Sequence, residues 1–320
     1  YFIFNVYALY CRFPFCFILL SSKEEERCCL ILFMKKLTYF GQLLKFRLST
    51  TVVFSAVVGY LLGIDTFILS EFIILIFGGF LVTGSANAFN QIIEKDTDKL
   101  MDRTMSRPLP KGNLSVIEAI IFSSFMAILG LYCLYELNPQ SSFFGLLSIL
   151  LYVLSYTPLK RISTISIFVG ALPGAIPFLL GWVAATDDFG LAAGTLFAIQ
   201  FFWQFPHFIA IAWVLDEDYK KAGLKMLFGN EKGTYPAIIS IVTSICMTII
   251  SVVPFFWGFP DLKLSVFAFI PVLFLGLCFT YKSYLLYKNT DDNTARQLMI
   301  ASFIYLPSMQ IIYVLDKFIF

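Results

Sequence analysis

Long apolar runs alternate with short polar connections along most of the chain. Nine of the runs lie near residues 50–68, 73–93, 115–136, 142–158, 163–185, 190–213, 235–257, 264–284 and 298–316. About 20 apolar residues in a helix are enough to cross a hydrocarbon core of about 30 Å. The pattern therefore predicts an all-α, polytopic membrane protein with nine transmembrane helices.

The composition supports this fold class. Of the 320 residues, 59% are hydrophobic and 14% are charged, whereas a soluble domain has roughly 25% charged residues. A transmembrane barrel would show short segments of alternating polarity instead of long apolar runs.

The basic residues that flank the spans are distributed unevenly between the two sides. On one side of alternate spans lie Lys35, Lys36, Lys45, Arg47, Lys95, Lys99, Arg103, Arg107, Lys111, Lys160, Arg161, Lys220, Lys221, Lys225, Lys232, Lys282, Lys288 and Arg296. The other side has only Lys263 and Lys317. Because cytoplasmic loops carry the excess of Lys and Arg, this asymmetry predicts that the body of the protein begins in the cytoplasm and ends outside.

The predicted transmembrane domain begins near the first methionine of the chain, Met34. We expect residues 34–320 to form a single domain. Residues 1–33 are expected to be a non-native or poorly ordered extension, with a signal-like or additional apolar segment as the alternative.

A polar stripe begins inside the second span. Asn90, Glu94 and Asp98 follow one another at intervals of four residues, so they share one face of a continuous helix. Asp102 extends the stripe if the helix continues that far. Carboxylate and carboxamide oxygens are suitable ligands for Mg²⁺, which also binds phosphate oxygens. The stripe therefore predicts a magnesium site, with Asn90, Glu94 and Asp98 as catalytic metal ligands.

Two arginines and two prolines follow this stripe. Arg103 and Arg107 are again four residues apart and can hold phosphate through charge-assisted hydrogen bonds. Pro108 and Pro110 are expected to end the helix, because proline cannot continue it. The whole segment predicts a cradle for a metal-bound diphosphate.

A solvated helix face is the alternative interpretation of this segment, with i,i+3 salt bridges of Lys95 with Asp98 or of Asp96 with Lys99. The depth of Asn90 and Glu94 favours the site, because polar groups inside a membrane are costly and tend to be functional. Asp96 lies about 200° around the helix from Glu94 and is expected to be solvated or to support the metal ligands without binding the metal itself.

A second acidic patch closes the sixth span. It consists of Asp216, Glu217 and Asp218, followed by Tyr219, Lys220 and Lys221. Because both patches leave the membrane on the same side, we expect them to face each other across a central cavity that opens toward the cytoplasm. Glu217 and Asp218 are candidate metal ligands, with Asp218 also catalytic, and Tyr219 and Lys221 are candidate substrate-binding residues.

Two further polar features lie near the same side. His207 is the single histidine of the chain. It either contacts a bound porphyrin or its iron, or stabilises charge in the cavity, or forms a hydrogen bond that fixes helix packing. The segment YTPLKR contains Lys160 and Arg161, which either bind phosphate or propionate or anchor the protein at the membrane surface.

These motifs resemble a known family. The segments NQIIEKDTDKLMDRT and SRPLPKG resemble the first signature of the UbiA-type membrane prenyltransferases, with Asn90, Glu94, Asp98, Arg103, Thr104, Arg107 and Pro108 in register. The segments WQFPHF, EDYKKAG, YTPLKR and FVGALPGAIPFLLGW are similar to the protoheme IX farnesyltransferase (heme O synthase) branch of that superfamily. The likeness extends from about residue 36 to the end of the chain.

The resemblance implies transfer of the farnesyl group from farnesyl diphosphate to the 2-vinyl group of heme b, which gives heme O for terminal oxidase assembly. It implies Mg²⁺ as the cofactor, held by Asn90, Glu94 and Asp98, and diphosphate held by Arg103 and Arg107. It also implies a bacterial inner membrane as the location, with heme A synthase or oxidase assembly factors as downstream partners. Nothing in the chain predicts a nucleic-acid partner.

Three positions depart from the family pattern. Val214 occupies the place of the first acid of the second signature, whose last acid is matched by Asp218. Asp216 stands where relatives in the heme branch often have a basic residue, and Glu94 replaces the usual aspartate. The metal role of the second patch is therefore less secure than that of the first.

Two other functions stay open at this point. A different branch of the same superfamily transfers a prenyl chain to an aromatic quinone precursor. A transporter with an intramembrane ion site would carry charged groups near mid-membrane, whereas the acids here cluster at the ends of spans.

Overall fold

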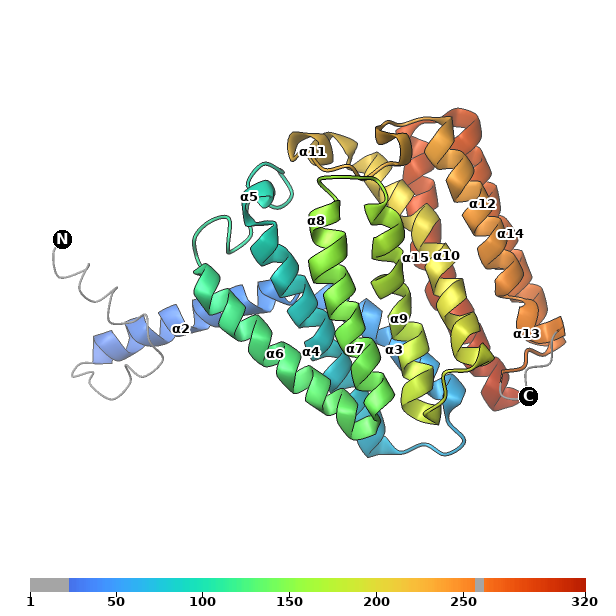
Figure 1. The fold of residues 1–320 in the computed structure, drawn as a ribbon, viewed down its shortest axis with the longest axis horizontal. Helices are drawn as coiled ribbons and strands as arrows, with labels where there is room; N and C mark the ends of the chain where they lie inside the picture. The colour runs from blue at the N-terminus through green and yellow to red at the C-terminus, as the bar shows by residue number, and fades with distance from the viewer. Residues whose placement is uncertain (1–22, 257–261) are drawn as a thin grey trace.

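The computed structural model describes residues 23–256 and 262–320, and this part of the chain consists of helices without a strand (Figure 1). Residues 1–22 of the predicted extension lie outside the described residues. The rest of that extension belongs to helix α2 (Lys23–Leu43), which runs past Met34.

Nine membrane-length segments are found within the described residues, as predicted. They are α3 (Phe46–Gly63), α4 (Leu69–Ile93), α6 (Val116–Leu137), the segment Pro139–Leu159, α9 (Ser166–Thr186), α10 (Leu191–Val214), the segment Thr234–Phe256, α14 (Val266–Asn289) and α15 (Asp292–Ile319). The segment Thr234–Phe256 combines α12 (Thr234–Ile250) with α13 (Val253–Phe256). Residue 257, the predicted end of that span, lies outside the described residues.

The fourth span is not a uniform α-helix. It consists of α7 (Pro139–Leu150), a π-helical segment η2 (Leu151–Tyr156) and one further turn, α8 (Thr157–Leu159). Short π-helical segments are rare and occur frequently at functional sites. This one carries Tyr152 and Tyr156.

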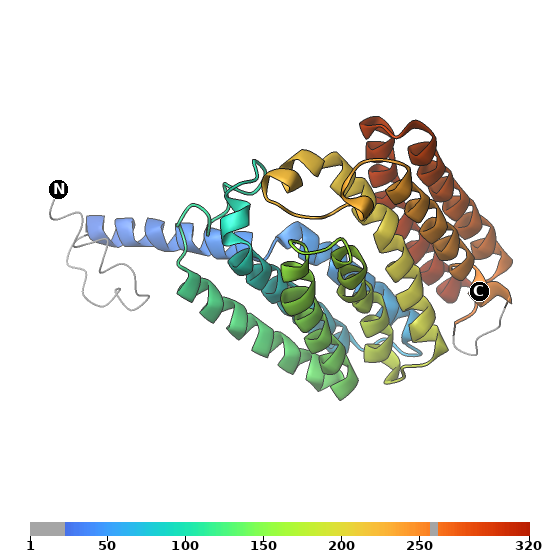
Figure 2. The same cartoon turned by 45° about the horizontal axis from the view of Figure 1, so that its top comes forward.

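The spans form a ring in which each helix packs on the next in the chain and α15 returns to α3 (Figure 2). Among the contacts that cross the ring, those of α3 with α9 and of α10 with α15 are the most extensive. The α3–α9 contact is close because a Cβ atom added to Gly181 would lie 1.8 Å from the backbone oxygen of Ala56. Small residues allow this approach of two backbones inside a membrane.

The two polar segments leave the ring at the same end. The short helix α5 (Lys95–Asp98) follows α4, and α11 (Asp216–Lys221) follows α10 (Figure 1). A 3₁₀ turn, η3 (Phe228–Asn230), lies between α11 and α12. The prediction that both acidic patches leave their helices at the same end is confirmed.

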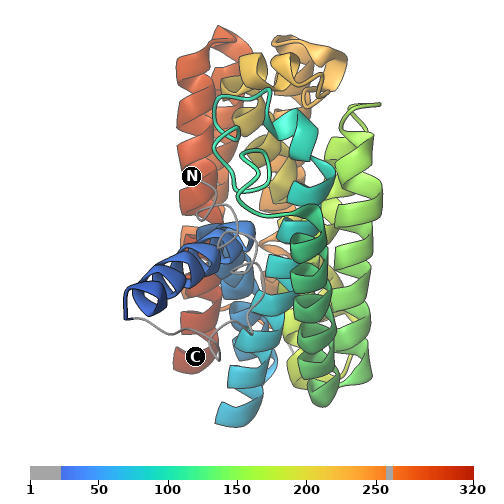
Figure 3. The same cartoon turned by 90° about the vertical axis from the view of Figure 1, so that its left-hand side faces the viewer.

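Helix α2 runs across the bundle instead of along it (Figures 1 and 3). Lys36 of α2 forms an ion pair of 2.5 Å with Glu118 in the first turn of α6. This ion pair therefore connects α2 to the first turn of α6.

Candidate active site

Asn90, Glu94 and Asp98 still lie on one face, although the helix is interrupted between Asn90 and Asp98. Helix α4 ends at Ile93, and Glu94 has non-helical torsions (φ −87°, ψ 5°) before α5 begins. The amide of Glu94 nevertheless donates to the Asn90 carbonyl at 2.9 Å, and the amide of Asp98 to the Glu94 carbonyl at 2.7 Å. The spacing of four residues is therefore preserved, and the three side chains line one pocket.

The predicted continuation of this helix to Pro108 is wrong. Helix α5 ends at Asp98, and turns follow. The hydroxyl of Thr104 donates to the Asp98 carbonyl at 2.9 Å, and the Arg107 guanidinium folds back onto the Asp98 carboxylate. These interactions close the helix before the prolines are reached. Asp102 therefore leaves the stripe, and its side chain is 72% exposed.

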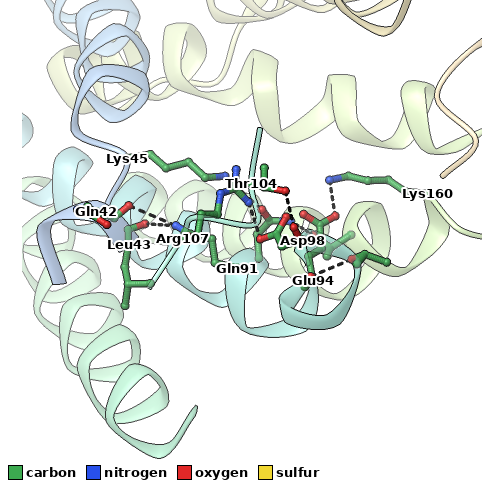
Figure 4. Close-up of polar contacts among 12 residues, drawn as sticks. Gln42, Leu43, Lys45, Gln91, Glu94, Asp98, Thr104, Arg107 and Lys160 are labelled. Carbon is green, nitrogen blue, oxygen red and sulfur yellow. Dashed lines mark hydrogen bonds and ion pairs between the residues drawn. The ribbon is translucent and has the colours of Figure 1, made fainter. Parts of the chain in front are cut away.

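Buried ion pairs occupy the pocket in place of the predicted alternative salt bridges. Lys160 Nζ lies 2.8 Å from Glu94 Oε1, and Arg107 Nη1 lies 2.6 Å from Asp98 Oδ2 (Figure 4). Only Asp96 follows the alternative, with an exposed pair to Lys99 at 3.0 Å. Buried charges are costly unless they are paired. The two ion pairs therefore allow the pocket to hold charged groups at a depth where the membrane disfavours them.

The two acids differ in their ionisation. Burial acts to raise the pKa of Glu94, but the adjacent Lys160 ammonium outweighs it and leaves that pKa below its usual value. Burial raises the pKa of Asp98, and Arg107 offsets this only in part. Burial would lower the pKa of Lys160, yet Glu94 raises it overall. The Glu94–Lys160 pair is therefore firmly ionised.

Lys45 also lines this pocket. The sequence identified it only as one of the basic residues that flank the spans. It caps the start of α3 in a left-handed conformation (φ 47°), and its Nζ donates to Asn90 Oδ1 at 3.2 Å. Burial and then the nearby Arg107 lower the pKa of Lys45 to about 7. A non-glycine residue in this strained conformation often marks a functional site. The torsion angle is visible only in the structure, so no signal in the sequence singled Lys45 out.

Asn90 is held in place by a residue of another span. Its Nδ2 donates to Thr157 Oγ1 at 3.1 Å, which leaves its carboxamide oxygen facing Lys45. The structure thus orients Asn90 as an oxygen donor toward the pocket.

The donor set of the pocket fits Mg²⁺. Asp98 Oδ1 is fully buried and has no hydrogen-bond partner among the described residues. Within residues 23–256 and 262–320, no three His, Cys, Asp or Glu side chains are close enough to form a metal site by themselves. An ion here would therefore need the Asn90 carboxamide beside Glu94 and Asp98, with phosphate or water oxygens completing its shell.

Most of the predicted substrate-binding residues meet at this pocket, which has a volume of about 140 Å³. Its polar lining includes Arg103, Arg107, Lys160 and Tyr219. Arg161 does not line it, although its guanidinium lies 3.4 Å from the Thr97 hydroxyl in α5. The pocket therefore combines oxygen donors with several cations, an arrangement suited to a metal-bound diphosphate.

The second acidic patch contacts the first through a lysine. Lys221 Nζ lies 2.7 Å from Asp102 Oδ2 and 3.6 Å from Asp218 Oδ1. Asp216 pairs with Lys220 at 2.8 Å. Glu217, Asp218 and Lys221 are absent from the lining of the pocket, so their predicted roles toward metal or substrate stay predictions.

A larger apolar cavity adjoins the polar pocket. Its volume is about 560 Å³, and it lies between α3, α4, α9, α10 and α15. Tyr152 and Tyr156 of the π-helical segment line both spaces. Tyr156 packs closely on Gly170, where an added Cβ would lie 2.6 Å from its ring. The two spaces thus share a tyrosine wall.

His207 belongs to the large cavity and not to the polar pocket. Its ring stacks on Trp203 with centroids 4.4 Å apart, and its Nδ1 lies 2.8 Å from Ser302 Oγ. Gln200 and Gln204 line the cavity on the same helix. Polar groups placed inside a membrane span are usually functional.

Comparison with known proteins identifies relatives of the whole membrane domain. A model of the UbiA prenyltransferase family matches residues 52–306. A protoheme IX farnesyltransferase from Flavobacterium psychrophilum is 47% identical over 283 residues, which cover 88% of this chain and 94% of that protein. One from Christiangramia forsetii is 49% identical over 284 residues, with the same two coverages of 88% and 94%.

Solved structures share the fold. A structure of digeranylgeranylglyceryl phosphate synthase superposes with a TM-score of 0.75 at 21% identity and covers 88% of this chain and 98% of its own. A UbiA homolog from Archaeoglobus fulgidus bound to DMAPP and Mg²⁺ superposes with a TM-score of 0.63 at 17% identity, covering 86% and 98%.

Proposed function

The chain belongs to the UbiA prenyltransferase family and, within it, to the protoheme IX farnesyltransferases, and we propose that it transfers the farnesyl group of farnesyl diphosphate to the 2-vinyl group of heme b. The product is heme O. The observation that carries this proposal is the polar pocket with Asn90, Glu94 and Asp98, which shares its tyrosine wall with a large apolar cavity.

The polar pocket is suited to the diphosphate. Lys45, Arg103, Arg107 and Lys160 line it together with the acids, so cations are available when the substrate arrives. Asn90, Glu94 and Asp98 would hold Mg²⁺, which neutralises the diphosphate and makes it a better leaving group. Arg107 and Lys160 would then exchange their carboxylate partners for phosphate oxygens.

The apolar cavity is suited to the organic parts of both substrates. The C1–O bond of farnesyl diphosphate breaks, diphosphate leaves with the bonding electrons, and the terminal vinyl carbon of heme attacks the allylic cation. Water then adds to the cation beside the porphyrin and loses a proton, which leaves a hydroxyethylfarnesyl side chain. A cavity that excludes bulk water protects the allylic cation from premature capture.

The positive-inside asymmetry supports an inner-membrane orientation with this pocket on the cytoplasmic side. The diphosphate would then arrive from the cytoplasm and the apolar tails from the bilayer. Heme O would pass to heme A synthase or to oxidase assembly factors.

The direct test is incubation of the purified protein with farnesyl diphosphate and either heme b or 4-hydroxybenzoate, with products identified by mass. We expect heme O, loss of turnover with EDTA and recovery with Mg²⁺. Prenylation of the benzoate alone would assign the chain's activity to the aromatic branch. Turnover that persists in EDTA would contradict the metal site.

A further inference from the structure

The imidazole ring of His207 is held in one orientation from several sides. Trp203 stacks on it at an interplanar angle of 18°, and Phe303 meets it edge-on with centroids 5.1 Å apart. The indole of Trp203 donates to the Ser302 backbone oxygen at 3.0 Å, and Ser302 Oγ lies 2.8 Å from His207 Nδ1. These contacts therefore fix the orientation of the ring.

The hydrogen bonds of Ser302 determine which ring nitrogen carries the proton. The Ser302 hydroxyl has one hydrogen, and it donates this hydrogen to the Met299 carbonyl at 2.6 Å. With that hydrogen on Met299, the contact between Ser302 Oγ and His207 Nδ1 is a hydrogen bond only when Nδ1 carries the proton, and this tautomer satisfies both contacts of Ser302. A neutral ring in this tautomer has an unprotonated Nε2 with its lone pair directed away from Ser302.

Nε2 is accessible from the large cavity. No described residue forms a hydrogen bond with Nε2. A fully buried nitrogen without a partner would belong to the small set of buried, unpaired polar atoms of the described chain, and Nε2 does not belong to it. It therefore retains some accessible surface, although the residue as a whole is 9% exposed. Because His207 lines the cavity of about 560 Å³, its lone pair is available to a molecule bound there.

The chemistry of the two proposed substrates leaves one partner for this lone pair. The farnesyl chain has no hydrogen-bond donor. The pyrrole nitrogens of heme are bound to iron, and its propionates are ionised at neutral pH and only accept. An unprotonated imidazole nitrogen is, by contrast, a common axial ligand of heme iron. A ligating histidine typically donates its other N–H to an acceptor that fixes the ring, as Ser302 does here.

We propose that His207 Nε2 is the axial ligand of the heme iron in the acceptor complex, and this proposal rests on the proposed function. The residue lies seven positions before Val214, the end of α10, which corresponds to about 10 Å along the helix. The macrocycle then lies in the apolar cavity below the polar pocket. His207 is a binding and positioning residue that fixes the iron and the plane of the porphyrin within the cavity.

The test is the resonance Raman spectrum of ferrous heme b bound to the purified full-length chain. We expect an iron–histidine stretching band in the wild type, its loss in His207→Ala, and its return when imidazole is added to that variant. His207→Gln, which is closer to histidine in volume, should also lack the band, so the result does not depend on how well the alanine variant folds. Ser302→Ala should keep the band but shift it, because Nδ1 loses its acceptor.

Gln204→Ala is the matched control, because Gln204 lies on the same helix and lines the same cavity. It should retain the band. A wild-type band in both His207 variants, no such band in heme-loaded wild type, or loss of the band in Gln204→Ala would overturn the proposal. If wild type converts heme b to heme O without the band, only this inference fails. If wild type neither binds heme nor farnesylates it, the proposed function itself fails.

Discussion

The ammonium nitrogen of Lys221 lies 2.7 Å from the carboxylate of Asp102, although 119 residues separate the two in the chain. This pair connects α11 to the turns after α5. Those turns carry Arg103 and Arg107, and α11 carries Tyr219, so the pair holds together two parts of the pocket lining. The two acidic segments therefore contact each other through the Lys221 ion pair, and their acids do not form one shared cluster.

We expect Lys221→Ala to have small effects on both stability and activity. The side chains of Lys221 and Asp102 are 50% and 72% exposed, and an exposed ion pair contributes about 1 kcal/mol or less to the free energy of unfolding. The value of kcat/KM should fall by less than about tenfold, in proportion to such an energy. Asp102→Ala should give the same loss, and the double variant should be no worse than either. Additive losses would show that the two residues act separately.

Glu94→Gln should lower kcat/KM by about 100-fold or more, because the loss of a supporting residue around a metal already costs about 10–100-fold. It should also destabilise the fold by about 3–5 kcal/mol, because the buried Lys160 loses its partner. Prenyl transfer and thermal unfolding in detergent measure the two effects.

Two variants separate these effects of Glu94. Glu94→Gln combined with Lys160→Met should regain stability without regaining activity. Asp96→Asn is the matched control, since the Asp96 side chain is 82% exposed and pairs only with Lys99. It should keep wild-type turnover. Equal losses in Asp96→Asn would contradict a site at the stripe.

The KM for farnesyl diphosphate should rise as pH increases above 7. The pKa of Lys45 is lowered to about 7 in the protein without substrate, so above that pH the side chain is mostly neutral and must take up a proton before it can pair with the diphosphate. Lys45→Arg should flatten the dependence between pH 7 and 9, because arginine stays charged. An unchanged slope in that variant would assign the dependence to another group.

Gly181→Ala should destabilise the protein by about 3 kcal/mol or more, because its new methyl group would lie 1.8 Å from the Ala56 carbonyl oxygen and force α3 and α9 apart. Gly194→Ala is the matched control, since nothing lies within 4 Å of a Cβ added there. It should unfold at the wild-type temperature or slightly above, because alanine favours a helix by about 1 kcal/mol. Equal unfolding temperatures for the two variants would contradict a close α3–α9 contact.

The sequence by itself determined the nine spans, the common side of the two polar exits and the stripe of Asn90, Glu94 and Asp98. These features depend on local periodicity and on the cost of polar groups in a membrane, and both can be read along the chain. The helix end was predicted wrongly because side-chain bonds from Thr104 and Arg107 close α5 at Asp98 before Pro108 is reached.

Only the tertiary structure decided which cations and hydroxyls complete each site. Lys45 reaches Asn90 across 45 residues, Lys160 reaches Glu94 across 66, and Ser302 reaches His207 across 95. Such partners come from helices brought together by packing of the ring, and no pattern of short period encodes them. Charge and hydrogen-bond direction at these contacts, which set the ionisation of the pocket and the tautomer of His207, follow from that packing alone.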